Sequence, residues 1–329
     1  MPYHMLFTTT LVTGTLMALS SNHWIYVWMG FEINLLSFIP IMLHSDKNQE
    51  TEASIKYFLI QALGSSLILL SSMSILFAPY SIFSPNLMMY MLIFALMVKM
   101  GAAPFHFWLP QIMSSISWMS CAILATWQKI APLFIIVSVT SPLSNKVIMT
   151  MAIISTLIGG LGGLNQTHLR ALLAYSSIGH LGWMIAGSVI SMSITSLYFL
   201  IYSLMTLSIM FISYDNTVKS NYMTSISNMS TSLSLSLMIL FLSLGGLPPL
   251  LGFLPKWMMI KSMIFQNMYL FISIMIISSL ISLFYYLSLF FNLFLNQSMK
   301  MHENKSAPSM MMNTSIVVTL TLGMVPLIM

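Results

Sequence analysis

The stretch MLIFALMVKMGAAPFHFWLP, residues 91–110, decides the fold class of this chain. A helix needs about 20 mostly apolar residues to cross a membrane, and this stretch has that length and composition. Gly101 and Pro104 interrupt it just after Lys99. Because a proline inside a span frees a backbone carbonyl that lipid cannot satisfy, the stretch predicts a transmembrane helix that is broken beside a functional site.

The rest of the chain has the same apolar character. Of its 329 residues, 58% are hydrophobic and only 5% are charged, whereas a soluble domain carries roughly 25% charged residues. The single cysteine, Cys121, excludes a disulfide framework within the chain and every cysteine-ligated iron–sulfur cluster. The Lys and Arg residues are scattered singly and form no basic stripe, so nucleic-acid binding is not indicated.

Cutting the sequence at its polar, proline and glycine clusters predicts one all-α membrane domain with about eleven transmembrane helices. The expected spans are Tyr3–Ser21, Asn22–Leu43, Ala53–Ala78, Asn86–Phe107, Ser114–Thr140, Val147–Leu164, Ala171–Ser191, Ile194–Ser213, Leu233–Lys261, Met268–Leu295 and Met311–Met329.

Charged residues in the predicted loops indicate the orientation of the chain. The loops on the N-terminal side carry Lys47, Arg170, Lys219, Lys300 and Lys305, whereas the loops on the other side carry Lys146 and Lys261. Because basic loops stay on the inner side of a membrane, this distribution places the N-terminus inside.

Four charged residues fall within the predicted spans: Glu32, Lys99, Lys129 and Lys256. Each costs about 2.5–3.5 kcal/mol at the centre of a bilayer. Burial disfavours the charged form of both an acid and an amine, so such groups can exchange protons near neutral pH. The alternative is that each side chain snorkels to the membrane surface or pairs without a function, which applies best to Lys256 near the end of its span.

A second break follows at Gly245-Gly246-Leu247-Pro248-Pro249. The two breaks lie in the fourth span of the first five and in the fourth of the next five. Broken helices at corresponding places in two halves of a chain indicate a transporter site. His106 beside the first break and His180 in a later span are secondary candidates, since a lone histidine in an apolar run is more often a hydrogen-bonded packing residue.

Several motifs together resemble one family. They are FEINLLSFIP at 31–40, VKMGAAPFHFWLP at 98–110, TWQKIAP at 126–132, LLAYSSIGHLGW at 172–183 and GGLPPLLGFLPKW at 245–257. The chain is similar to the antiporter-like membrane subunits of mitochondrial respiratory complex I, the NADH:ubiquinone oxidoreductase, of the animal type. The resemblance implies two inverted five-helix bundles at 1–140 and 147–295 and a final helix at 311–329.

The resemblance also implies that Glu32, Lys99, Lys129 and Lys256 form a proton path, in which Glu32 is the ion-pair partner of Lys99. The family's fuller form has three further N-terminal helices, for which this chain has no room. NADH, flavin, iron–sulfur clusters and ubiquinone would belong to other subunits, and no cofactor is expected to bind this chain. Its partners would be the other membrane subunits of complex I and lipids, and its location the mitochondrial inner membrane.

Two other readings stay open. One is a subunit of a multi-subunit Na⁺/H⁺ antiporter, a related class that shares the broken helices and the lysines. The other is a structural spacer that has no proton path of its own and holds neighbouring pumps together.

Overall fold

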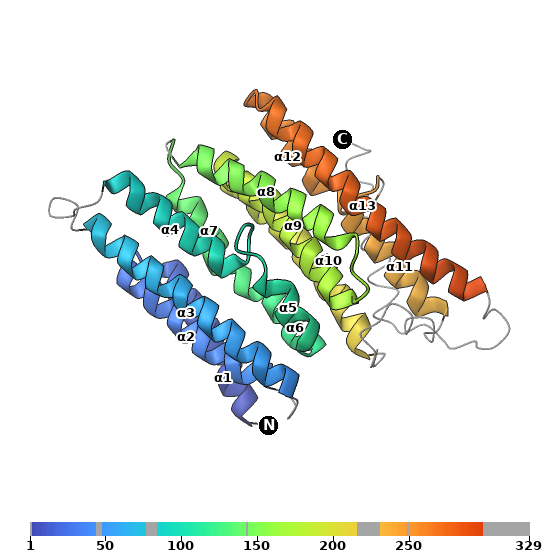
Figure 1. Cartoon of the computed structure of the whole chain (residues 1–329), viewed down its shortest axis with the longest axis horizontal. Coiled ribbons are helices and arrows are strands. Elements are labelled where there is room, and N and C mark those ends of the chain that lie inside the picture. The colour runs from blue at the N-terminus through green and yellow to red at the C-terminus, as the bar shows by residue number, and fades with distance from the viewer. Residues whose placement is uncertain are drawn as a thin grey trace.

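The computed structural model describes residues 2–43, 48–76, 84–142, 144–215, 231–248 and 250–298, which fold almost entirely into helices (Figure 1). In lipid every backbone N–H and C=O must be paired within the chain, and a helix achieves this locally. The helices are α1 (Pro2–Ser20), α2 (Trp24–Met42), α3 (Asn48–Leu76), α4 (Pro85–Met100), α5 (Trp108–Ser115), α6 (Trp118–Ala125), α7 (Trp127–Val139), α8 (Asn145–Gly163), α9 (Leu169–Ile190), α10 (Met192–Asp215), α11 (Thr231–Gly245), α12 (Phe253–Phe265) and α13 (Tyr269–Ser298).

The long helices confirm the membrane class. Among the described residues, seven helical segments are long and apolar enough to cross a membrane, and α4 and α11 are shorter apolar helices. The expected span Met311–Met329, the loop lysines Lys47, Lys219, Lys300 and Lys305, and Pro249 lie outside the described residues. The total number of crossings therefore stays a prediction.

One boundary differs from the sequence prediction. We expected one span at Asn86–Phe107, but the helix α4 ends at Met100, and the next helix, α5, begins at Trp108, beyond the end of the expected span. The next helix, α6, begins at Trp118 rather than at Ser114. The eight residues of α5 are too few to form a span alone, so α5 belongs to the broken helix that starts with α4.

The buried apolar side chains form two clusters at different depths in the membrane. We call the first cluster the N-side layer, because it contains side chains from the end of α2 and from the starts of α3 and α9, on the side where α1 begins. We call the second cluster the far layer, which contains side chains from the start of α2, the end of α9 and the start of α13. Helices α1, α2, α3, α9, α10 and α13 contribute buried side chains to both layers, whereas α8 contributes only to the far layer.

The two broken helices cross these layers in opposite directions. The first runs from the far layer, which contains Leu92 of α4, to the N-side layer, which contains Ile112 of α5. The second runs from the N-side layer, with Leu240 of α11, to the far layer, with Met263 of α12. Both breaks consequently lie near the middle of the membrane.

The first half and the second half of the chain pack against each other through their central helices. In Figure 1 the helices lie side by side in a row from α1–α3 at one end to α12 and α13 at the other. Helices α5, α6 and α7 pack against α9 and α10. At this junction Arg170 donates a hydrogen bond to the carbonyl of Ile116, and its guanidinium lies 5.2 Å from the ring of Trp118. Arg170, predicted as a loop charge, thus ties α9 to the end of α5.

Candidate functional site

The charged residues predicted within the spans lie between the two apolar layers. Each charged residue has one neighbour along the chain in the N-side layer and another in the far layer. For Glu32, Lys99, Lys129 and Lys256, the neighbours in the N-side layer are Leu35, Trp108, Ala125 and Leu251, in that order. The neighbours in the far layer are Phe31, Met100, Ala131 and Met259, in the same order. The three lysines are buried, with exposed fractions of 6%, 2% and 8% in chain order, and Glu32 is half-buried. All four residues therefore occupy a band at mid-membrane depth.

The first break positions Lys99 at the end of α4. Gly101 ends the helix with φ 71°, a left-handed conformation that costs a residue with a Cβ atom about 1–2 kcal/mol. The Nζ atom of Lys99 lies 4.2 Å from the centre of the Phe31 ring on α2, close enough for a cation–π interaction. The carbonyl of Lys99 accepts a hydrogen bond of 3.2 Å from the Nε2 atom of Gln61 on α3.

Glu32 does not form the direct ion pair with Lys99 that the resemblance implied. Its carboxylate accepts a hydrogen bond from the hydroxyl of Ser65 on α3, while the Lys99 ammonium faces the aromatic ring of Phe31. Phe31, whose ring lies against the Lys99 ammonium, directly precedes Glu32 on α2. The carboxylate and the ammonium therefore lie in the same part of the band without an ion pair between them.

Lys129 lies just after a bend that the sequence analysis did not predict. Helix α6 ends at Ala125, and α7 begins at Trp127. At Thr126 between them, the hydroxyl donates a hydrogen bond of 2.7 Å to the carbonyl of Ala122, a contact that often bends helices. Beyond the bend, the Nζ atom of Lys129 donates to the hydroxyl of Tyr202 on α10 at 3.4 Å.

His180 connects the environment of Lys129 with that of Lys256. Its Nδ1 atom is 3.0 Å from the hydroxyl of Tyr198, and its ring centre is 5.3 Å from that of Tyr202. Lys256 and His180 line the same pocket. Sequence reasoning missed the two tyrosines, although their spacing of four residues within an apolar span places them on one face of α10.

The second break brings Lys256 back to the end of α11. Gly246 has φ 81°, which again is a left-handed conformation. The Nζ atom of Lys256 on α12 donates a hydrogen bond of 2.9 Å to the carbonyl of Gly245, the last residue of α11. A side chain from beyond the break thus pairs one of the carbonyls that the break frees.

His106 lies apart from the contacts that join His180 to the lysines. Its Nδ1 atom is 3.2 Å from the carbonyl of Pro104, and its ring packs against Phe107 with the centres 4.2 Å apart. A third ring, that of Tyr175 on α9, is 6.4 Å away. These contacts within the first break support a packing role for His106.

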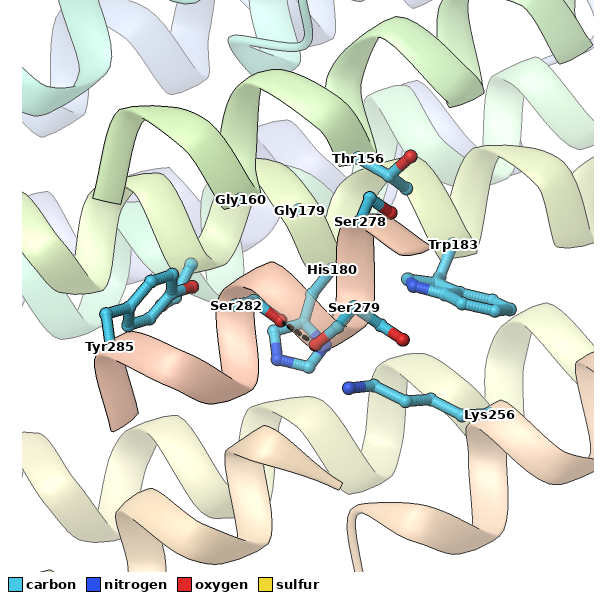
Figure 2. Close-up of a pocket in the computed structure, with 11 residues that line it drawn as sticks. Thr156, Gly160, Gly179, His180, Trp183, Lys256, Ser278, Ser279, Ser282 and Tyr285 are labelled. Carbon is cyan, nitrogen blue, oxygen red and sulfur yellow. Dashed lines mark hydrogen bonds between the residues drawn. The ribbon is translucent and has the colours of Figure 1, made fainter. Parts of the chain in front are cut away.

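A small polar pocket opens beside Lys256 (Figure 2). Lys256 and His180 point into it from α12 and α9, and Ser278, Ser279 and Ser282 line it from α13. The hydrogen bonds of Lys99 and Lys129, by contrast, do not join these two lysines within the described part of the chain.

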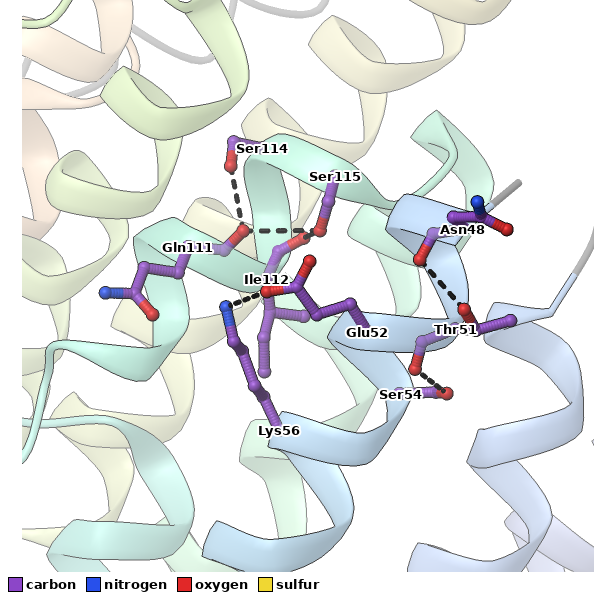
Figure 3. Close-up of polar contacts among 9 residues, drawn as sticks. All are labelled: Asn48, Thr51, Glu52, Ser54, Lys56, Gln111, Ile112, Ser114 and Ser115. Carbon is purple, nitrogen blue, oxygen red and sulfur yellow. Dashed lines mark hydrogen bonds and ion pairs between the residues drawn. The ribbon is translucent and has the colours of Figure 1, made fainter.

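Helix α3 carries a pair of charged residues outside this band. Lys56 and Glu52 form an ion pair of 2.6 Å on the exposed start of α3, close to Gln111 of α5 (Figure 3). Because solvent screens an exposed pair one helical turn apart, this ion pair contributes little to stability. Among the described residues, no three His, Cys, Asp or Glu side chains gather where a metal ion could bind.

A family model described as "NADH:quinone oxidoreductase/Mrp antiporter, TM" matches residues 21–282. The chain belongs to this family. It is 45% identical over 283 residues to the NADH-ubiquinone oxidoreductase chain 2 of Lumbricus terrestris, covering 85% of this chain and 84% of that one. It is 42% identical to the protein of the same name from Locusta migratoria, covering 98% of this chain and 93% of that one.

Solved structures share the fold of this chain over most of its length. A chain of respiratory complex I from Thermus thermophilus superposes with a TM-score of 0.82 at 23% identity, covering 98% of this chain and 78% of that chain. A chain of the Mrp complex from Dietzia gives a TM-score of 0.82 at 15% identity, covering 98% of this chain and 75% of that chain. At these identities the likeness concerns the fold alone. The expected antiporter-like fold is thereby confirmed.

Proposed function

We propose that this chain is a core membrane subunit of mitochondrial respiratory complex I and that it contributes a proton path. Other subunits would transfer electrons from NADH to ubiquinone, and the coupled movement of protons would run through residues of this chain. The proposal is supported by its relatives, which are named NADH-ubiquinone oxidoreductase chain 2 in animals as distant as an earthworm and a locust. Its location would be the inner mitochondrial membrane, with other membrane subunits and lipid around it.

The observation that carries the proton path is the band of ionisable groups between the two apolar layers. A buried charge is costly, and such residues in a membrane mark pathways for ions or protons. Here Glu32, Lys99, Lys129, His180 and Lys256 occupy one depth, in helices that lie side by side along the row. A purely structural spacer gains nothing from this arrangement.

The path would begin at Glu32 and Lys99. A change at Glu32, transmitted from a neighbouring subunit, would alter the electrostatic stabilisation of the Lys99 ammonium and allow it to release a proton toward Lys129. Since no hydrogen bond joins these two lysines within the described residues, water would carry this step. From Lys129 the route would continue through the hydroxyl of Tyr202 and the imidazole of His180 to Lys256.

The two halves of the chain would share this work. The unit at 1–140 would contain Glu32, Lys99 and Lys129, and the unit at 147–295 would contain Lys256 and the second break. The loop charges support an N-terminus on the matrix side. The N-side layer would then face the matrix, and the far layer would face the intermembrane space.

Two variants in the assembled complex test the function. Lys129→Met removes the ionisable group but keeps a long apolar side chain, whereas the control Lys261→Met changes an exposed lysine on α12. Complexes in proteoliposomes are assayed for NADH oxidation and for proton uptake with a pH-sensitive dye. We expect Lys129→Met to lower pumping strongly and the control to pump normally.

If assembled Lys129→Met complex pumps at the normal rate, the proton path is wrong and the spacer reading is favoured. Replacing Na⁺ by K⁺ in the same assay separates the remaining alternative. A Na⁺/H⁺ antiporter subunit would lose proton uptake without Na⁺, whereas the proposed path would not.

A further inference from the structure

The pocket beside Lys256 is lined mainly by residues that carry a hydroxyl group. Besides the lysine and His180, its polar lining comes from Thr156 on α8, Ser176 on α9 and the serines of α13. Tyr285 of α13 and Trp183 of α9 also line it. Figure 2 shows Lys256 and His180 pointing into the space that these side chains surround.

The hydroxyl groups present acceptors, rather than donors, to this pocket. Thr156 donates its own hydrogen to the carbonyl of Ile153 at 2.9 Å, and Ser278 donates to the carbonyl of Met275 at 2.7 Å. Ser282 likewise donates to the carbonyl of Ser279 at 2.8 Å. A hydroxyl has two acceptor lone pairs besides its one hydrogen, so each oxygen remains able to accept from a cationic group.

Lys256 supplies the matching donors. An ammonium group has three N–H donors, and the carbonyl of Gly245 accepts one of them at 2.9 Å. The side chain is more than nine-tenths buried, and the remaining donors are at the pocket. The volume open to the centre of a water molecule is about 10 Å³, which is roughly the room that one water requires.

The pocket extends from mid-membrane depth toward the N-side layer. On α13, Met275 belongs to the far layer and Tyr285 to the N-side layer, and Ser278 and Ser282 lie between them. Gly160 of α8 allows this close contact between helices, because a Cβ atom there would lie 2.9 Å from the carbonyl oxygen of Ser278. On α13 the polar lining thus reaches from the depth of Lys256 toward the N-side layer, whereas Trp183, a residue of the far layer, bounds the pocket on the other side.

We propose that this pocket binds one ordered water through which Lys256 exchanges protons with a hydroxyl-lined branch between α8 and α13. The Lys256 ammonium donates a proton to the water, and the neutral amine keeps its hydrogen bond to Gly245. The water accepts this proton as it passes one of its own to the hydroxyl oxygen of Ser282, while the Thr156 oxygen accepts a hydrogen bond from the water. Ser282 in turn passes its hydroxyl hydrogen to the hydroxyl oxygen of Tyr285, on the side of the N-side layer. This inference rests on the proposed function and adds Thr156 and Ser282 to the residues that serve it.

Paired substitutions in the assembled complex separate a proton-carrying role from helix packing. Thr156→Val keeps the side-chain shape but removes the hydroxyl, and Thr156→Ser restores it. Ser282→Ala is matched by Ser273→Ala, because Ser273 on the same helix makes the same type of bond, to Leu270 at 2.8 Å, but is exposed. We expect Thr156→Val and Ser282→Ala to slow proton uptake by about tenfold, as when a hydrogen bond to a charged group is lost.

Thr156→Ser and Ser273→Ala should pump like the unaltered complex. If Thr156→Val and Ser282→Ala also pump normally while Lys256→Met does not, the branch is wrong and the proposed function stands. If Lys256→Met pumps normally, the proposed role of Lys256 fails and the branch fails with it. Should a variant not assemble, a cryo-electron microscopy map of the unaltered complex decides: ordered water elsewhere in the band but none in this pocket overturns the proposal.

Discussion

Tyr202→Phe is the sharpest test of the route between Lys129 and Lys256. The substitution removes one oxygen and leaves the ring that packs near His180 in place. Tyr202 is fully buried, so bulk water cannot replace the lost acceptor. Lys129 would then lack the only side-chain hydrogen-bond partner that the described residues give it.

The size of the effect follows from the geometry. A hydrogen bond to a charged group contributes about 1.5–3 kcal/mol. The Lys129–Tyr202 distance of 3.4 Å is longer than a typical N–H···O bond, so the lower value applies. A difference of about 1.4 kcal/mol is a factor of ten, and we therefore expect proton transfer through this step to slow by about tenfold.

The assay measures proton uptake per NADH oxidised by assembled complex in proteoliposomes. Tyr214→Phe is the matched control, because Tyr214 lies on the same helix but has an exposed fraction of 49%. The control should pump normally. Equal pumping by Tyr202→Phe and the control would refute the route through Tyr202, whatever the outcome for Lys129→Met.

Three further predictions concern packing, the second break and orientation. Gly159→Ala should destabilise the complex by about 1–3 kcal/mol, because its Cβ atom would lie 2.4 Å from the backbone nitrogen of Gly179. Gly179→Ala should be tolerated, since its nearest neighbour would be 3.8 Å away, and equal melting temperatures would contradict this asymmetry. Gly246→Ala should impair pumping more than Gly245→Ala, because position 246 has φ 81° and a Cβ atom there would lie 3.0 Å from the Lys256 Nζ atom. Proton uptake by the two variants in proteoliposomes checks this difference. The single cysteine, Cys121, is buried, so a cysteine introduced at an exposed loop position can be labelled selectively. Asn165→Cys should react with an impermeant thiol reagent from the matrix side only, and Asn22→Cys from the other side only. The opposite labelling would show that the orientation is reversed.

The sequence by itself determined the class of the protein and the location of its unusual features. Lipid solvates neither a charge nor an unpaired backbone group, so composition alone required transmembrane helices. The same property of lipid made Lys99 and Lys129 conspicuous in their spans. It also marked Gly101 and Gly246, each of which ends a helix in the left-handed conformation. These features are local in the sequence, and the structure keeps them where they were predicted.

The tertiary structure alone decided which groups meet. Glu32 contacts Ser65 instead of Lys99, and Lys129 reaches Tyr202, which is 73 residues away in the sequence. Lys256 turns back to the carbonyl of Gly245. Such contacts depend on how each helix is rotated about its axis and how far it is shifted along its neighbours. In a chain that is apolar on nearly every helix face, periodicity does not reveal that rotation, so only the packed helices show it.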